Sequence, residues 1–376
     1  YILDKAGALV AMDEYFTEKE LSAYIPGFLE EGRFNENNEL LLFPILKSTE
    51  LFTANETDWE PFAQETGITP QSIKTHEDLC KAAKTYYEWT DAMTPNIKED
   101  GKALYGRDSV ANYIFIGCYQ LGHEIFKVED GVMTLDMDKD TMRTLWDNYY
   151  IPYINGYFGA YARFRSEDCK MGKILALTSS SSSVGYLPTA VTDINDTTHD
   201  ISTYITRALP FEGTVTEAIV QQGASYCLLK STPAAQEGAV EFIKWFTAYE
   251  RNLDFAMMSG YSPVTIEANT AQAINSSFNQ DATTPKGKNV LGALITGAEA
   301  FSECDAYATK PFNGSKEVRI ILGDALEQKA AEDRRQVISL MEAGQTRQQA
   351  VSNFITDENF NTWFEELCLK VNETVK

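Results

Sequence analysis

Short apolar strands alternate with amphipathic helices along this sequence, and this alternation is the feature that most restricts the fold. Strands that alternate with helices predict an α/β fold. Because 376 residues exceed the roughly 250–300 at which a single core stops growing, we expect two lobes with a cleft between them. The expected strands are Lys173–Thr178, Ile205–Leu209 and Ala218–Val220, and the main expected helices are Val110–Leu121, Lys139–Tyr149, Ala234–Met258 and Val318–Ala343.

The charge balance limits the partners of the chain. It has 55 acidic and 32 basic residues, which give a net charge of −23 at pH 7. Such a potential repels phosphate backbones and anionic lipid surfaces. We therefore expect no nucleic-acid partner, and an anionic ligand would need a local cation. No apolar run approaches the roughly 18 residues that cross a bilayer.

Motifs for catalysis and metal binding are missing from the sequence. The six cysteines form no Cys-x-x-Cys pair, and there are only three histidines. No Gly-x-Ser-x-Gly, Gly-x-Gly-x-x-Gly or Walker loop occurs. Asp108 and Glu124 could form a glycosidase couple, but 55 carboxylates supply such pairs by chance. We expect a binding protein without a metal or cofactor.

Ser259–Val264 ends the helical pattern of Ala234–Met258 and leaves a tyrosine at the turn. Gly260 suits the left-handed conformation that closes many helices, and Pro263 prevents the helix from resuming. Tyr261 then lies where its ring could stack on a ligand. The alternative is an ordinary helix end with a half-buried tyrosine.

The same helical pattern has a distinct apolar side. Ala235, Ala239, Phe242, Ile243 and Phe246 recur at helical spacing. This spacing predicts that the helix packs against a larger body.

Serine and aromatic clusters are further candidates for ligand contacts. Residues 179–183 are five serines that directly follow an apolar strand, so they form either a flexible linker or a ligand-facing loop. Sugars stack on aromatic rings, and Tyr157, Phe158 and Tyr161 lie in a glycine-containing aromatic segment. A hydrophobic cluster beside a helix explains these rings equally well.

Arg319 follows a Gly-Ser turn and opens a helix. Its guanidinium suits a carboxylate, a phosphate or paired hydroxyls. The alternatives are a solvated helix face or an ion pair with Glu317.

Five segments, taken in order, form a family pattern: Phe43-Pro44 with Ser48–Glu50, Ala176–Ser183, Gln222–Ser225, Ser259–Val264, and Gly314-Ser315 with Val318-Arg319. Together they resemble the extracellular solute-binding proteins of carbohydrate ABC importers, in the branch that includes glycerol-3-phosphate- and oligosaccharide-binding proteins. The resemblance covers essentially the whole chain.

The resemblance implies a two-lobed α/β fold of the periplasmic-binding-protein type. The N-terminal lobe would consist of residues 1–47 and 231–305, and the C-terminal lobe would consist of residues 48–222 and 317–376. The chain would cross the hinge near residues 45–50, 220–226 and 306–316. Arg319 would match the arginine that meets phosphate in glycerol-3-phosphate binders. The implied ligand contacts are Ser48, Glu50, Ser180, Ser182, Gly223, Ala224, Ser225, Gly260, Tyr261 and Arg319.

The resemblance also implies the role and the location of the protein. It would bind a carbohydrate outside the cytoplasm and deliver it to an ABC permease. The protein would be either periplasmic or attached to the cell surface by a lipid anchor, and only this lipid anchor would contact the membrane. Alternatives are a polyol-phosphate binder, a glycoside-active enzyme, and a surface adhesin or scaffold. Tyr1–Gly7 has the pattern of a helix end. Against the family, we expect the first strand, helix and second strand of the N-terminal lobe to be missing before it.

Overall fold

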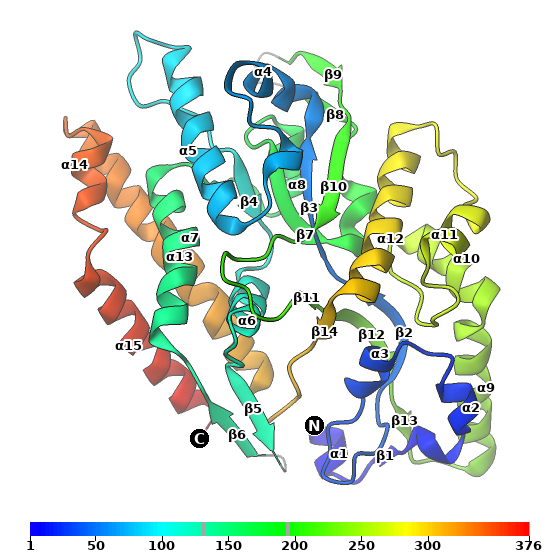
Figure 1. Cartoon of the computed structure of the whole chain (residues 1–376). Helices are drawn as coiled ribbons and strands as arrows, with labels where there is room; N and C mark the ends of the chain where they lie inside the picture. The colour runs from blue at the N-terminus through cyan, green and yellow to red at the C-terminus, as the bar shows by residue number, and fades with distance from the viewer. Residues whose placement is uncertain (130–131, 193–195, 376) are drawn as a thin grey trace.

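The computed structural model describes residues 1–129, 132–192 and 196–375, and the elements alternate as expected for an α/β protein (Figure 1). The strands are β1 (Leu9–Val10), β2 (Phe43–Ser48), β3 (Glu50–Asn55), β4 (Tyr105–Arg107), β5 (Phe126–Glu129), β6 (Val132–Leu135), β7 (Ala176–Ser180), β8 (Ala190–Thr192), β9 (Thr198–Asp200), β10 (Thr203–Arg207), β11 (Ala218–Val220), β12 (Gln222–Tyr226), β13 (Leu228–Leu229) and β14 (Asp305–Tyr307). The α-helices are α1 (Ile2–Lys5), α2 (Glu18–Leu21), α3 (Pro26–Glu30), α4 (Glu56–Thr66), α5 (His76–Ala92), α6 (Val110–Gln120), α7 (Lys139–Asn155), α8 (Arg165–Lys170), α9 (Pro233–Thr247), α10 (Tyr249–Ser259), α11 (Ala271–Ser277), α12 (Pro285–Glu303), α13 (Ser315–Glu342), α14 (Arg347–Ser352) and α15 (Asp357–Thr374).

The largest sheet has four strands in the order β10-β3-β7-β4. Strand β3 is antiparallel to both β10 and β7, whereas β4 and β7 run parallel. Two smaller pairs, antiparallel β12-β2 and parallel β11-β14, lie toward the lower half of the molecule in Figure 1. Only Thr49 separates β2 from β3. A single extended and fully buried segment therefore connects the β12-β2 pair to the large sheet.

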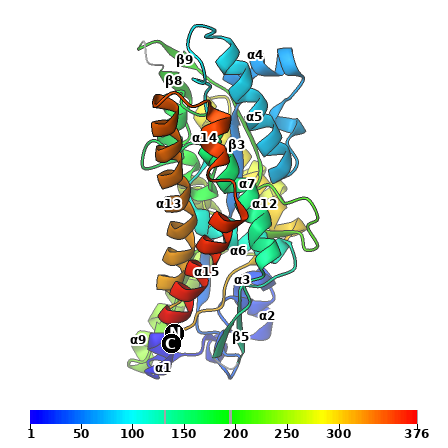
Figure 2. The same cartoon turned by 90° about the vertical axis from the view of Figure 1, so that its left-hand side faces the viewer.

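The hydrophobic core is divided between the two ends of this segment. On the β3 side, Phe52, Trp146 and Tyr150 belong to a large cluster with α13 and α15, which stand side by side in Figure 2. On the β2 side, Phe28 and Phe43 belong to a separate cluster. Helix α12 contributes residues both to this second cluster and to one that includes the large sheet. The predicted lobe boundaries stay a prediction.

Local sequence rules set several helix ends as expected. Gly260 closes α10 at φ 74°, and its N–H donates to the carbonyl of Ala256 at 2.8 Å. The pattern Ala234–Met258, however, is two helices, because Ala248 has an extended backbone (φ −60°, ψ 145°). After this break, the Asn252 side chain donates to the Ile45 carbonyl and accepts from the Val264 N–H, which joins α10 to β2.

Candidate ligand-binding site

The segment from Lys47 to Thr49, at the junction of β2 and β3, brings three predicted ligand-binding segments together. The N–H of Ser181 donates to the Thr49 carbonyl at 2.7 Å. Lys47 and Ser262 exchange backbone hydrogen bonds of 2.6 and 3.1 Å. Gly223 of β12 lies opposite Lys47 in the β12-β2 register. The serine turn, the tyrosine turn and β12 therefore all contact the same crossing segment.

The tyrosine turn also packs directly on the serine turn. A Cβ atom built on Gly260 would lie 2.9 Å from Val184 Cγ1 and 3.1 Å from the Ser181 carbonyl oxygen. The next residue, Tyr261, is partly buried. The hydroxyls of Ser180 and Ser182, also partly buried, lie 2.8 Å apart and bond each other. These hydroxyls can exchange their mutual bond for one to a ligand hydroxyl.

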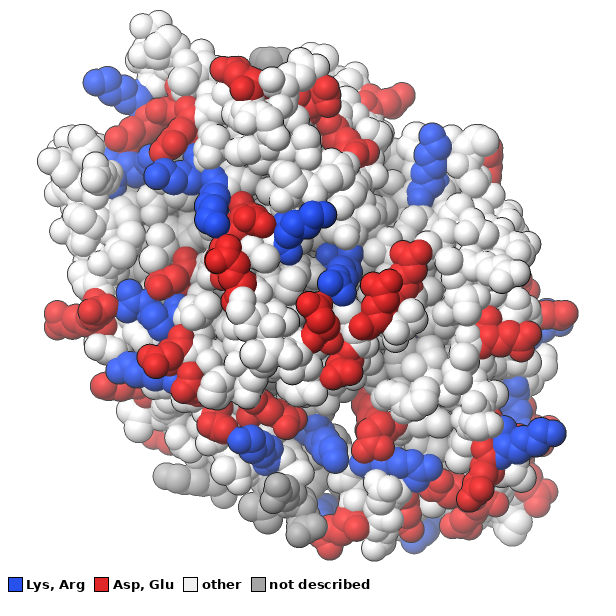
Figure 3. Space-filling model, viewed as in Figure 1, with Lys and Arg blue, Asp and Glu red and all other residues white. Residues whose placement is uncertain are grey.

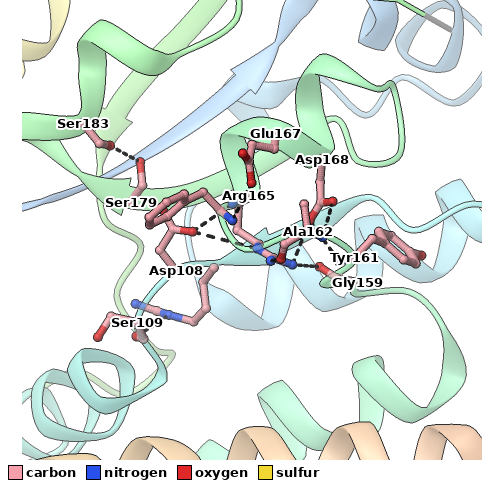
Figure 4. Close-up of polar contacts among 12 residues, drawn as sticks. Asp108, Ser109, Gly159, Tyr161, Ala162, Arg165, Glu167, Asp168, Ser179 and Ser183 are labelled. Carbon is pink, nitrogen blue, oxygen red and sulfur yellow. Dashed lines mark hydrogen bonds and ion pairs between the residues drawn. The ribbon is translucent and has the colours of Figure 1, made fainter.

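Strands β4 and β7 end at the same edge of the large sheet, where the serine turn begins. Because they are parallel, their carboxyl ends meet there, and ligands of open α/β sheets bind at such edges. Asp108 follows β4, and its N–H donates to the Thr178 carbonyl at 3.0 Å. Figure 4 shows Asp108 between the hydrogen-bonded pair Ser179–Ser183 and Arg165.

Asp108 is held by the first residue of α8. Its carboxylate accepts the Arg165 N–H at 2.9 Å, and the Arg165 guanidinium pairs with Asp168 at 2.8 Å. Burial raises the pKa of Asp108, against the opposing effects of the Arg165 N–H and charge. Glu124, the other half of the possible glycosidase couple, instead accepts from the Tyr307 hydroxyl at 3.3 Å.

A second polar network lies behind the crossing segment. Glu50 pairs with Arg107 at 2.7 Å and accepts from the Asn112 amide at 2.8 Å. Arg319 donates to Asn112 Oδ1 and makes no ion pair with a carboxylate among the described residues. Burial lowers the pKa of Arg319, against the charge of Glu50. Gln222 of β12 makes a longer contact of 3.5 Å with Asn112, so the network joins β12 to α6.

Ser48 and Glu50 were expected to contact ligand, but they are 2% and 4% exposed. The Glu50 carboxylate already accepts from Arg107 and Asn112, and its contact with a ligand stays a prediction. The cavity beside it has a volume of about 20 Å³, which is room for one water molecule but not for a sugar.

Two rings of the aromatic segment lie where the second interpretation, a hydrophobic cluster, has them. Tyr157 and Phe158 are buried in the large core cluster, because Tyr157 packs on Tyr87 and Phe158 packs on Tyr105. Tyr161 is 56% exposed, and its N–H donates to Asp168. In Figure 4 it lies on the far side of Arg165 from the serines. The structure does not bring these three rings to the serine turn.

The remaining candidates lie on β12. Gly223 and Ala224 are exposed, and the Ser225 hydroxyl accepts from the buried ammonium of Lys47 at 3.2 Å. Lys47 also pairs with Glu31. A groove of about 600 Å³ lies elsewhere, between α2 and the α9–α10 junction, and its walls include Tyr24, Lys244 and Tyr249.

Arg165 and Asn112 were not named as candidates, and Asp108 was named only as half of a possible glycosidase couple. The signal was present in Tyr105–Arg107, a short strand that precedes Ser109, and Ser109 caps α6. Recognising β4 would have placed Asp108 at a strand end beside the serines.

The buried His76 gives the structure a testable pH dependence. Its ring packs 4.4 Å from Phe211, and burial, with the charge of Arg107, lowers its pKa well below the ordinary 6.5. The unfolded chain binds a proton here below pH 6.5 and the folded chain does not, so the free energy of unfolding falls as the pH decreases through 6.5. Urea unfolding between pH 7.5 and 5.5 should show a total loss of about 1.4 kcal/mol from this group, reduced in His76→Gln and retained in His123→Gln. Equal slopes in wild type and His76→Gln would contradict it.

Comparison with known proteins identifies the family. A family model for bacterial extracellular solute-binding proteins matches residues 2–285. This chain belongs to that family. Its members are substrate-binding proteins and not enzymes, which agrees with the sequence interpretation. No curated protein sequence is significantly similar to the chain.

Solved structures of solute-binding proteins share the two-lobed fold. UgpB from Mycobacterium tuberculosis, in complex with glycerophosphocholine, matches with a TM-score of 0.63 and 14% identity, over 100% of this chain and 82% of its own. The cyclic alpha-maltosyl-1,6-maltose binding protein from Arthrobacter globiformis matches with a TM-score of 0.60 and 14% identity, over 95% and 80%. This solute-binding protein therefore has the predicted fold of two lobes.

Two further expectations concern metals and membranes. Among the described residues, no group of three or more His, Cys, Asp or Glu side chains is arranged to hold a metal ion. No helix in the described part of the chain is both long and apolar enough to span a bilayer.

Proposed function

We propose that this solute-binding protein takes up a sugar or oligosaccharide between its lobes, outside the cytoplasm, and delivers it to the permease of an ABC importer. The observation that carries the proposal is the convergence of the serine turn, the tyrosine turn and β12 on Lys47–Thr49. This segment joins the two sheets, so ligand contacts here respond to hinge closure. The fold shared with the cyclic alpha-maltosyl-1,6-maltose binding protein supports the carbohydrate assignment.

Within the site, Tyr261 supplies a ring for stacking, and Ser180 and Ser182 supply hydroxyls. The exposed backbone of Gly223 and Ala224 adds donors and acceptors from the opposite side. Charged side chains of both signs are interspersed over the face shown in Figure 3. Within the site, the mixture of a ring, hydroxyls and backbone groups suits a neutral polyhydroxylated ligand.

A polyol phosphate is the second candidate, and Arg319 is the observation that favours it. Its guanidinium has no carboxylate partner among the described residues and is held by Asn112 within the network behind the crossing. UgpB in its complex with glycerophosphocholine shares the fold. A thermal-shift screen with sugars and with glycerol-3-phosphate distinguishes the two candidates, because only the class that binds should raise the melting temperature. A bound ligand stabilises the folded chain by about 2.7 kcal/mol at a hundredfold excess over its Kd.

Replacement of Tyr261 by alanine tests the site. We expect Tyr261→Ala to weaken calorimetric affinity for the ligand from the screen by about tenfold or more, because stacking area is lost. Tyr249→Ala is the matched control, since Tyr249 lines the separate groove of about 600 Å³. If Tyr249→Ala weakens binding and Tyr261→Ala does not, the ligand occupies that groove and the site assignment is wrong.

A further inference from the structure

One carboxylate, that of Glu31 at the end of α3, receives two buried side chains from different strands. The ammonium of Lys47, whose side chain is fully buried, donates to Glu31 Oε2 and lies 3.2 Å from the Ser225 hydroxyl. The side-chain amide of Gln221 donates to the same Glu31 oxygen. Helix α3 packs against β2 and β14 (Figure 1), so Glu31 lies where these segments meet.

Gln221 extends this contact to a third segment. Its side chain is buried, and among the described residues its Oε1 atom has no hydrogen-bond partner. The bond to Glu31 therefore orients the Gln221 side chain. The backbone N–H of Gln221 donates to the Tyr307 carbonyl of β14 at 2.7 Å. Glu31 thus joins residues from all three predicted hinge crossings, near 45–50, 220–226 and 306–316.

A second group of contacts holds the residues that come next along the first two crossings. Glu50 of β3 pairs with Arg107 at 2.7 Å, and Gln222 of β12 lies 3.5 Å from Asn112 of α6. Asn112 also donates to Glu50 at 2.8 Å, so this group belongs together. It ties the crossings to the large sheet and α6, whereas the Glu31 group ties them to α3.

The part of the chain between the two groups is short. In the first crossing only Ser48 and Thr49 lie between the residues that the groups hold. In the second crossing the held residues, Gln221 and Gln222, are adjacent. Ser48 lies opposite Gln222 in the β12-β2 register. Rotation of one group relative to the other must therefore pass through this pair of positions.

Neutralisation of the buried ammonium would explain the Lys47–Glu31 pair alone. It does not explain why the uncharged Gln221 donates to the same oxygen, since Gln221 needs no counter-ion. A carboxylate that accepts from two crossings also fixes their relative position, because an ionised acceptor makes stronger hydrogen bonds than a neutral one.

We propose that Glu31 is a positioning residue, whose carboxylate holds the predicted crossings as one rigid unit, and that lobe closure turns about the Ser48–Gln222 pair. Because the Lys47 backbone bonds Ser262, this unit carries the tyrosine turn and β12 toward a ligand together. The inference rests on the proposed function, since it concerns how the lobes close, but it needs no contact between Glu31 and the ligand.

Hydrogen exchange of the ligand-free protein tests this coupling. Glu31→Gln should speed exchange at least about tenfold at the amides of Ser262 and of position 221, because both crossings lose their common anchor. Gln221→Met removes only one donor to Glu31, so it should speed exchange at position 221 and leave Ser262 within about twofold of wild type. Glu99→Gln is the matched control and should change neither amide, because Glu99 is 28% exposed, against 25% for Glu31, and its partner is Arg347.

Three results would overturn the proposal. The first is faster exchange in Glu31→Gln at only one of the two amides, or at neither. The second is an equal increase in the amides of α7, which would show that Glu31→Gln only destabilises the whole fold. The third is unchanged exchange at position 221 in Gln221→Met, which decides the matter if Glu31→Gln does not fold. Because no ligand is present, these results do not depend on whether a sugar binds.

Discussion

Arg107→Met should lower the free energy of unfolding by about 3–5 kcal/mol, because it leaves the Glu50 carboxylate buried without its cation. The two side chains are 4% and 5% exposed and 2.7 Å apart. Urea unfolding followed by tryptophan fluorescence measures the change. The double variant Glu50→Leu/Arg107→Met should recover much of the loss, since it removes both charges.

An exposed ion pair provides the comparison. Lys81 and Glu212 lie 3.3 Å apart with side chains 70% and 58% exposed. Lys81→Met should cost less than about 1 kcal/mol, because solvent screens this pair. If Arg107→Met costs no more than Lys81→Met, the buried Glu50 carboxylate does not depend on Arg107, which would favour the predicted contact of Glu50 with a ligand.

Local rules were enough to predict the parts of the site that depend on neighbouring residues. Gly260 was expected to close a helix in the left-handed conformation, and it does so at φ 74°. The serines were expected to follow a buried strand that ends at Thr178; Ser179 and Ser180 instead end β7, and Ser181–Ser183 follow it. The turn and the strand end are determined within a few residues, so the sequence alone identifies them.

Partners far apart in sequence could not be predicted in this way. Glu50 meets Arg107 and Asn112 only because β3, β4 and α6 pack together. Tyr157 and Phe158 are core residues for the same reason, since composition does not distinguish a ring that stacks on a ligand from one that stacks on Tyr87 or Tyr105. The assignments that changed are therefore those that needed tertiary contacts.

Gly223→Ala should lower the free energy of unfolding by about 2–4 kcal/mol, from backbone strain and from overpacking. Gly223 has φ 118°, and a Cβ atom there would lie 2.4 Å from the Leu46 carbonyl oxygen and 2.9 Å from Lys47 Cα. These are backbone atoms of β2, so the methyl group must displace one strand from the other.

Gly67→Ala separates the two contributions to this loss. Gly67 closes α4 at φ 74°, and a Cβ atom there would meet nothing within 4 Å. Gly67→Ala should therefore lower the free energy of unfolding only by the strain of the left-handed backbone, about 1–2 kcal/mol. A larger loss in Gly223→Ala, measured by urea unfolding, isolates the clash with β2. Because Lys47 of β2 also contacts the tyrosine turn, displacement of β12 should weaken ligand binding as well as stability. Equal losses of unfolding free energy in Gly223→Ala and Gly67→Ala would contradict the predicted clash, because β2 would then accommodate the methyl group without strain.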